Sequence, residues 1–168
     1  GHSAFYNCSL LTNITLPSGV TSIANYAFYN CSSLTGLTIP SGVTSIEYAT
    51  FYRCSSLTNI ILPAGLTSIS YYAFYSCSSL TGISIPSAVT SIESSAFYSC
   101  RSVARIIVKA GNSSFVYYDF KIFNSDQTEL LAYPAGKPEA TDSIHSSVTS
   151  SFYSAFRSSR LLTGSTLS

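Results

Sequence analysis

Charged side chains are scarce in this chain of 168 residues, of which only 9% are Asp, Glu, Lys or Arg. An ordinary globular domain carries roughly 25%. The chain has two histidines and no methionine or tryptophan. Acid–base and metal chemistry depend on titratable groups, and here these groups are few and scattered. The sequence therefore argues against an acid–base or metal-dependent enzyme, and we expect no cofactor and no metal site.

A basic surplus and long apolar runs are also missing. Eight Lys and Arg residues nearly balance seven Asp and Glu residues, which leaves a formal net charge of +1. Nucleic acids and anionic membranes are bound through dense basic patches, so we expect neither as a partner. No apolar run approaches the roughly 18 residues of a membrane-spanning helix. The first residues carry no signal-peptide pattern and begin within a repeat, and we expect a fragment of a longer array.

Hydroxyl side chains take the place of charged ones, with 35 serines and 16 threonines.

The sequence repeats every 23 residues. Such a period is typical of solenoids and other repeat architectures. Phenylalanine, cysteine and proline each form a ladder of this step. The ladders are Phe5, Phe28, Phe51, Phe74 and Phe97; Cys8, Cys31, Cys54, Cys77 and Cys100; and Pro17, Pro40, Pro63 and Pro86.

One repeat unit, residues 25–47, reads NYAFYNCSSLTGLTIPSGVTSIE. Ala27, Cys31 and Leu34 follow helical spacing, which predicts a short helical or 3₁₀ turn with one inward stripe. Residues 37–39 alternate apolar and polar and predict a short strand. The Pro-Ser-Gly segment 40–42 predicts a corner in which glycine is free to adopt a positive φ. Residues 43–46 predict a second short strand.

A single unit of this length buries too few side chains to fold alone. Stacking pairs the strands of neighbouring coils and covers both faces of every interior coil. We therefore expect a repeat solenoid with short parallel strands and a short helical or 3₁₀ turn in each coil.

The spacing of Cys31, Leu34, Leu37 and Ile39 is similar to that of a leucine-rich repeat, and AFYNCSSLTGLTIPSGVTSI resembles the BspA-like leucine-rich repeat family over residues 3–116. This resemblance implies that the solenoid is a right-handed superhelix. The later segment DFKIFNSDQTELLAYPAGK resembles the hairpin-bearing coil of such proteins. Its apolar runs, 120–123 and 130–133, surround a turn-rich loop and predict a β-hairpin. We expect one domain, residues 1–168. Its coils are predicted at 2–24, 25–47, 48–70, 71–93 and 94–116, followed by a hairpin-bearing coil at 117–146 and a degenerate last coil at 147–168.

The five cysteines suggest a metal or redox site, but their spacing argues against both. One thiol in each coil makes a row along the axis, with about 4.8 Å between neighbours. A row does not bring four thiolates to one tetrahedral zinc, and parallel side chains do not face each other as a disulfide requires. We expect free, buried cysteines that pack as small hydrophobic residues.

No residue is marked out as catalytic. His2 lies at the edge of the chain, and His145 has no acid or cysteine close to it in the sequence. A G-x-S-x-G elbow and a glycine-rich phosphate loop are both absent. We expect no enzymatic activity.

A row of tyrosines is the first candidate binding surface. One tyrosine follows the inward phenylalanine of each coil, and its ring is expected at the surface. The row is Tyr6, Tyr29, Tyr52, Tyr75 and Tyr98, with Tyr26, Tyr48, Tyr71, Tyr72 and Tyr153 close to it. Tyrosine combines a large contact area with a hydroxyl, so the row suits binding of protein or glycan. The alternative is lateral ring stacking that stiffens the coil edge.

A row of threonines at the first strand of each coil is the second candidate. It consists of Thr12, Thr35, Thr58 and Thr81. Leucine-rich repeats generally bind partners through this open face. A neighbouring hydroxyl row is interrupted by Ile61 and Ile107, which argues against a regular ice-binding array. Arg101, Arg105 and Lys109 predict a local basic patch.

Resemblance to BspA-like proteins implies a non-catalytic cell-surface or secreted module for adhesion. Its partners would be extracellular-matrix proteins, or proteins or glycans of host or neighbouring cells. The alternative is a structural spacer within a larger surface protein, without a ligand of its own. Open coil ends also predict end-to-end self-association.

Overall fold

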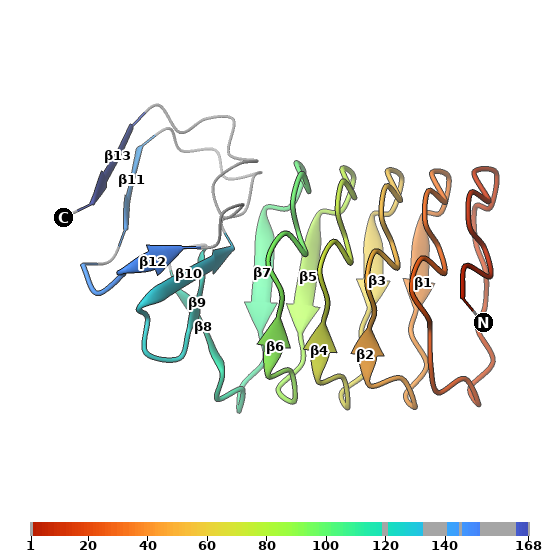
Figure 1. The fold of residues 1–168 in the computed structure, drawn as a ribbon, viewed down its shortest axis with the longest axis horizontal. Helices are drawn as coiled ribbons and strands as arrows, with labels where there is room; N and C mark the ends of the chain where they lie inside the picture. Colours follow the sequence, from red (N-terminus) through yellow and green to blue (C-terminus); the bar gives the residue numbers. More distant parts are fainter. Residues whose placement is uncertain (1, 119–120, 133–140, 145, 152–163, 168) are drawn as a thin grey trace.

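The structure, a computed structural model, describes residues 2–118, 121–132, 141–144, 146–151 and 164–167. Successive turns of the chain stack side by side along one long axis, and the N-terminus lies at one end of the stack (Figure 1). The molecule is an elongated solenoid because each turn packs chiefly against the turn before it and the turn after it.

Short parallel strands form two flanks of the solenoid. Residues 23 positions apart pair with each other, as Leu37 does with Ile60 and Ile46 does with Ile69. The first flank holds β1 (Gly36–Thr38), β3 (Asn59–Ile61), β5 (Gly82–Ile85) and β7 (Arg105–Val108). The second flank holds β2 (Ser45–Ile46), β4 (Ser68–Ile69) and β6 (Ser91–Ile92). The expected solenoid of short parallel strands is confirmed.

The hydrophobic core lies between the two flanks and gains one layer with every coil. Phe28, Phe51 and Phe74 are buried, and their rings stack 5.4 Å apart from one coil to the next. Aliphatic ladders complete each layer. They include Leu34, Leu57 and Leu80; Val43, Leu66 and Val89; and Ile46, Ile69 and Ile92.

The segment expected as a short helical turn is a series of tight turns, and no helix occurs in the part of the chain that the structure describes. The reason is an alternation of amide partners through residues 26–31. The Tyr29 amide donates to the Tyr26 carbonyl within the same coil, at 3.1 Å, whereas the Phe28 amide donates to the Thr50 carbonyl of the next coil, at 2.9 Å. A helix keeps its amide hydrogen bonds within its own segment. Here half of the amides hold two coils together instead.

Two residues of each turn segment have a left-handed backbone, and neither is a glycine. In one coil they are Tyr26 and Asn30, with φ of 59° and 57°. The equivalent residues elsewhere are Ser3, Asn7, Ala49, Arg53, Tyr72, Ser76, Ser95 and Ser99. The amides of Tyr26 and Asn30 both donate to the next coil. The inter-coil bonds thus compensate for backbone conformations that non-glycine residues otherwise avoid.

The corners between the flanks differ from the expectation in one respect. The Val43 amide donates to the Pro40 carbonyl at 3.1 Å, which closes a tight turn as expected. However, the corner glycine Gly42 does not have a positive φ. Ala88 occupies the equivalent position of a later corner, which shows that this turn does not require glycine.

The C-terminal part contains the expected hairpin. β9 (Lys121–Asn124) and β10 (Glu129–Ala132) pair antiparallel around a loop in which the Asn124 carboxamide oxygen accepts from the Glu129 amide at 2.8 Å. β8 (Phe115–Tyr118) adds an antiparallel strand that the sequence did not indicate.

Parallel pairing returns beyond the hairpin. β12 (Ser150–Ser151) pairs with β10, and β11 (Thr141–Ile144) pairs with β13 (Gly164–Leu167). Residues 152–163, which include Tyr153, lie outside the described residues. The predicted division into coils stays a prediction.

Candidate binding surfaces

A continuous stack of tyrosine rings runs along one edge of the solenoid. We call it the tyrosine ridge; it consists of Tyr6, Tyr29, Tyr52, Tyr75 and Tyr98. Successive ring centroids are 4.8, 4.7, 4.6 and 4.7 Å apart, with the ring planes within 14° of parallel. Tyr6 is exposed and the others are half-buried. The predicted row is therefore a real structural feature, whereas its role in binding stays a prediction.

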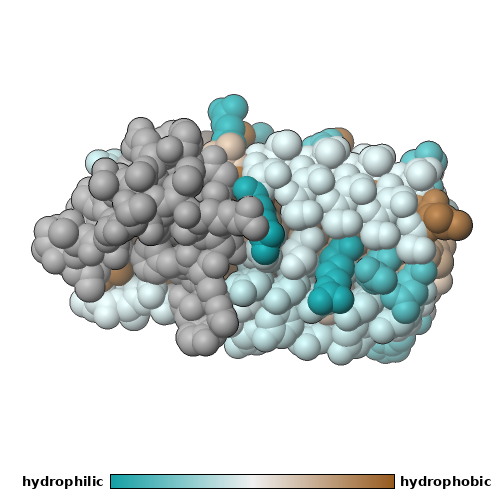
Figure 2. Space-filling view, turned by 90° about the horizontal axis from the view of Figure 1, so that it is seen from above, coloured by the Kyte–Doolittle hydropathy of each residue, from teal (hydrophilic) through white to brown (hydrophobic). Residues whose placement is uncertain are grey.

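The turn segments explain how the ridge is positioned. Phe28 and Tyr29 are adjacent in the chain, and the inward orientation of Phe28 directs the Tyr29 ring outward. These segments form the upper edge of the solenoid in Figure 1. The same edge in Figure 2 is mainly pale, of intermediate hydropathy, with few strongly hydrophilic side chains. Such a surface exposes hydroxyls and aromatic area with little charge.

A second set of tyrosines meets the ridge edge-on, since the Tyr26 ring lies 5.9 Å from that of Tyr29 at 64° and the Tyr72 ring lies 5.5 Å from that of Tyr75 at 82°. Tyr26 contacts Tyr48, with ring centroids 5.3 Å apart and planes inclined by 72°, and Tyr48 contacts Tyr72 at 5.7 Å and 83°. A groove of about 390 Å³ is lined by these three residues, by Ala49 and by three members of the ridge. Tyr71 is also exposed, but its hydroxyl is hydrogen-bonded to Glu93, which raises its pKa.

Two tyrosine hydroxyls of the groove, those of Tyr48 and Tyr75, stay neutral. Burial raises the pKa of the Tyr48 and Tyr75 hydroxyls above the usual value, and neighbouring tyrosines add to the shift. A phenol that remains protonated both donates and accepts hydrogen bonds. One cation lies beside the ridge, because the Arg53 guanidinium sits 5.5 Å from the centroid of the Tyr52 ring. The groove thus favours a largely neutral partner that carries polar groups.

The predicted threonine row is exposed, but its hydroxyls are engaged within the solenoid. The Thr35 hydroxyl donates to the Thr12 carbonyl at 3.1 Å, and the Thr58 hydroxyl donates to the Thr35 carbonyl at 2.9 Å. Thr81 continues the ladder with a 3.3 Å bond to the Thr58 carbonyl. These threonines satisfy carbonyl groups between coils, and only their acceptor lone pairs remain for a partner. Binding by this row stays a prediction.

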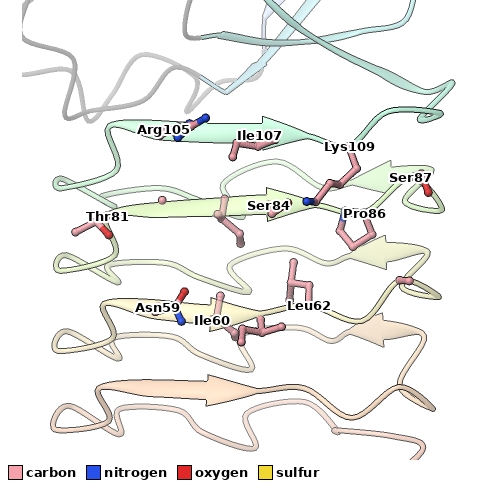
Figure 3. Close-up of a pocket in the computed structure, with 14 residues that line it drawn as sticks. Asn59, Ile60, Leu62, Thr81, Ser84, Pro86, Ser87, Arg105, Ile107 and Lys109 are labelled. Atoms are coloured by element: carbon pink, nitrogen blue, oxygen red, sulfur yellow. The ribbon is translucent and has the colours of Figure 1, made fainter.

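A larger hollow, of about 730 Å³, lies on the first flank and was not indicated by the sequence. Side chains of β3 and β7 rise on either side of β5, as Figure 3 shows. Two of the three residues of the predicted basic patch, Arg105 and Lys109, line it. The feature of the sequence that could have indicated it is the occurrence of Gly82 and Ser84 where the neighbouring coils carry larger residues.

The cysteines form the expected row of free thiols. Cys31, Cys54, Cys77 and Cys100 are buried, whereas Cys8 in the first coil is exposed. The Cys54 thiol donates to a main-chain carbonyl of the preceding coil at 3.1 Å, and the other buried cysteines do the same. Burial raises the pKa of the Cys31 thiol to about 11 and that of Cys100 to about 12. These thiols are therefore protonated near neutral pH.

Groups associated with catalysis do not converge in the described part of the chain. No cluster of three or more His, Cys, Asp or Glu side chains that could hold a metal ion occurs among the described residues. His2 is exposed, and His145 lies outside the described residues. Within the same residues, no helix is long and apolar enough to cross a membrane.

Comparison with solved structures supports the architecture. A leucine-rich cell surface protein from Faecalibacterium prausnitzii A2-165 aligns over 90% of this chain and 46% of its own, with 29% identity and a TM-score of 0.79. A leucine-rich repeat protein from Eubacterium ventriosum aligns over 92% of this chain and 47% of its own, with 26% identity and a TM-score of 0.76. The pneumococcal vaccine antigen PcpA shares the fold, with 22% identity over 86% of this chain and 42% of its own and a TM-score of 0.77.

This chain spans less than half of the length of each of these three proteins. No curated protein matches the chain. The family model of the BspA type leucine-rich repeat region matches six copies over residues 1–126, which is most of the sequence. The chain therefore belongs to the BspA-type leucine-rich repeat family.

Proposed function

We propose that this chain is a non-catalytic adhesion module, secreted or displayed on a cell surface. It binds an extracellular-matrix protein, or a surface protein or glycan of a host or neighbouring cell. Family membership supports a repeat module that binds other molecules, and the relative from Faecalibacterium prausnitzii is a cell surface protein. Three of the five residues of the tyrosine ridge line the groove that we assign to the partner.

The observation that carries this proposal is the exposed aromatic edge. Five stacked rings extend over about 19 Å, and a second set of tyrosines forms a groove beside them. Tyrosine rings that are already stacked lose little conformational freedom when a partner binds. Their hydroxyls supply directional hydrogen bonds without the cost of desolvating a charge. Rigid, neutral aromatic surfaces of this kind suit protein and glycan partners.

The test is attachment of the protein to immobilised matrix proteins and to cell surfaces, measured by surface plasmon resonance and cell-binding assays. Replacing Tyr29, Tyr52 and Tyr75 together by Ser should abolish attachment. Replacing the same residues by Phe keeps the stacked rings and removes only the hydroxyls. The Phe variant should therefore bind more weakly than the native protein but more strongly than the Ser variant.

A second pair of variants separates the two candidate surfaces. Replacing Thr35, Thr58 and Thr81 by Ala tests the threonine row. The matched control replaces Thr44, Thr67 and Thr90 by Ala, because these exposed threonines form an equivalent inter-coil ladder, with a 2.9 Å bond from Thr67 to the Thr44 carbonyl. Attachment lost only in the Thr35 set would move the site to the first flank. No attachment of the native protein to any surface would favour a spacer.

A further inference from the structure

The hollow on the first flank arises from small residues in one coil. The outward positions of β5 are Gly82 and Ser84, and the equivalent positions of the next coil are Arg105 and Ile107. In the preceding coil, 23 residues earlier, these positions hold Asn59 and Ile61. β5 is therefore the floor of a trough whose walls are the larger side chains of β3 and β7 (Figure 3).

The shape of the trough suits an extended chain. It follows the direction of β5, and its walls stand two strand spacings apart, about 10 Å. The space between the walls is one strand position wide, so it takes a single extended segment. A larger residue at position 82 could not close the trough without a shift of the backbone, because a Cβ at Gly82 would approach the Arg105 carbonyl oxygen to 3.0 Å.

The lining of the trough is apolar in the middle and positively charged along one wall. Ile61 is 53% exposed, and Leu62 and Ile107 are half-buried beside it. Arg105 and Lys109 are exposed on the β7 wall. None of the described residues that line the trough is acidic. The two cations are thus not neutralised by a carboxylate of the lining, and the trough presents positive charge to a ligand.

The floor contains one hydroxyl without a partner. The Ser84 oxygen is shielded from solvent and has no hydrogen-bond partner among the described residues. A buried polar group in this state destabilises the unliganded protein. Because Ser84 is smaller than Ile61 and Ile107 at the equivalent positions, the floor leaves room for a side chain of a partner above it.

From these features we propose that the trough binds an extended acidic segment of a partner protein. The segment carries acidic side chains at positions i and i+4 and an aliphatic side chain at i+2. Arg105 and Lys109 are also four residues apart, and about 13 Å separates the Cα atoms of such residues in an extended chain. Both cations can therefore lie beside an acidic side chain of the bound segment at the same time. The aliphatic residue then lies over Ser84, between Ile61 and Ile107. Alternation of side chains in an extended chain places all three on the same face.

This site goes beyond the tyrosine ridge and does not depend on it. The trough belongs to the flank of β3, β5 and β7, whereas the ridge belongs to the turn segments, three of which follow β2, β4 and β6. The Tyr-to-Ser variant should therefore bind the acidic segment as the native protein does. Failure of one proposal leaves the other standing, since the two use separate residues and separate assays.

The test uses fluorescein-labelled peptides with blocked ends and fluorescence anisotropy with the whole chain. The peptide TETVTET carries the required spacing. TETVETT has the same composition with the acids three apart, and TQTVTQT has no charge. TETVTET should bind roughly tenfold more tightly than either control, since both ion pairs need the correct register. Raising NaCl from about 50 to about 500 mM should weaken its binding.

Variants of the protein locate the binding site. Ser84→Ile fills the floor and should reduce affinity for TETVTET by about tenfold or more. Its matched control, Thr38→Ile, places the same side chain at the equivalent position of β1, outside the trough. Arg105→Gln and Lys109→Gln should each weaken binding about three- to tenfold. Arg101→Gln, which removes an exposed cation outside the lining, should have no effect.

Four results would overturn the proposal: no binding of TETVTET, equal binding of TETVETT or of TQTVTQT, equal binding to Ser84→Ile, or unchanged binding when both cations are removed. Sialyllactose is the last ligand to be tested. If this anionic sugar binds the trough and the peptides do not, the ligand is a glycan and the assignment to an acidic peptide segment is wrong.

Discussion

The rings of Tyr29 and Tyr52 lie 4.7 Å apart, with their planes inclined by only 2°. This separation equals the spacing of hydrogen-bonded strands, roughly 4.7–4.9 Å. The backbone repeat therefore sets the distance between rings, and each added coil extends the stack. Stacking along the edge, which the sequence suggested as an alternative to binding, is present in the structure. The same arrangement also exposes a continuous aromatic surface, on which the proposed adhesion rests.

We predict that Tyr52→Ser lowers the free energy of unfolding by about 1–3 kcal/mol, because it removes two stacked contacts of about 0.5–1.5 kcal/mol each. Tyr52→Phe keeps both contacts and should change stability by less than about 0.5 kcal/mol. Urea unfolding followed by circular dichroism measures both values. If the two variants were equally destabilised, the hydroxyl rather than the stacked ring would be the stabilising group.

A second prediction concerns the left-handed residues of the turn segments. Ser76 has a φ of 58°, a conformation that costs a residue with a Cβ about 1 kcal/mol or more and costs glycine nothing. Ser76→Gly should therefore raise the free energy of unfolding by about 0.5–1 kcal/mol, despite the greater freedom of glycine in the unfolded chain. Thermal and urea unfolding measure the change.

Ser79 in the same coil provides the control for this substitution. It is half-buried, its φ is not positive, and its amide donates to the Ser55 carbonyl at 3.2 Å. Ser79→Gly should destabilise the protein by about 0.5–1 kcal/mol, since glycine gains nothing in this conformation. Equal effects at Ser76 and Ser79 would show that the left-handed backbone carries no strain.

A third prediction concerns the cysteine row. Cys8 is exposed, whereas Cys31 and Cys100 are buried with pKa values raised to about 11 and about 12. Only the thiolate reacts with alkylating agents. At pH 8 iodoacetamide should modify Cys8 in the native protein and the four buried thiols only after denaturation. Mass spectrometry of labelled peptides identifies the modified residues. Rapid labelling of Cys54 in the folded protein would contradict the buried row.

The same thiols predict a loss of stability in alkali. In the folded protein the pKa of Cys31 is raised from 9.0 to about 11, so the unfolded chain loses its proton first as the pH rises. The contribution of this thiol is fully present below pH 9 and declines between about pH 9 and 11, by at most about 1.4 kcal/mol per pH unit. Cys31→Ala should be less stable at pH 7 and show a shallower decline above pH 9. An unchanged slope would show that other groups cause the alkaline loss.

Much of the fold could be predicted because the important contacts repeat. The step of 23 residues brings Phe28 next to Phe51 in every arrangement that stacks the units in register, so the core, the parallel pairing and the aromatic row followed from spacing. The hairpin followed from apolar runs around a polar loop. The prediction of a helical turn was wrong because half of the amides in this segment donate to carbonyl groups of the next coil. The spacing of buried side chains does not show which carbonyl an amide will bond. The positive φ expected at the corner glycines was wrong for a related reason, since the corner closes as a turn that also accepts Ala88.

The sequence by itself determined the period, the family and the inward and outward sides of each coil, since these depend on the order of residues within one unit. Tertiary structure decided which surfaces the outward side chains of neighbouring coils form together. Gly82 and Ser84 are ordinary small residues in their own coil, and they form a trough only because Ile61 and Ile107 stand beside them in the coils on either side. A surface of this kind depends on neighbours across the stack, and strand pairing fixes those neighbours at a spacing of about 4.8 Å.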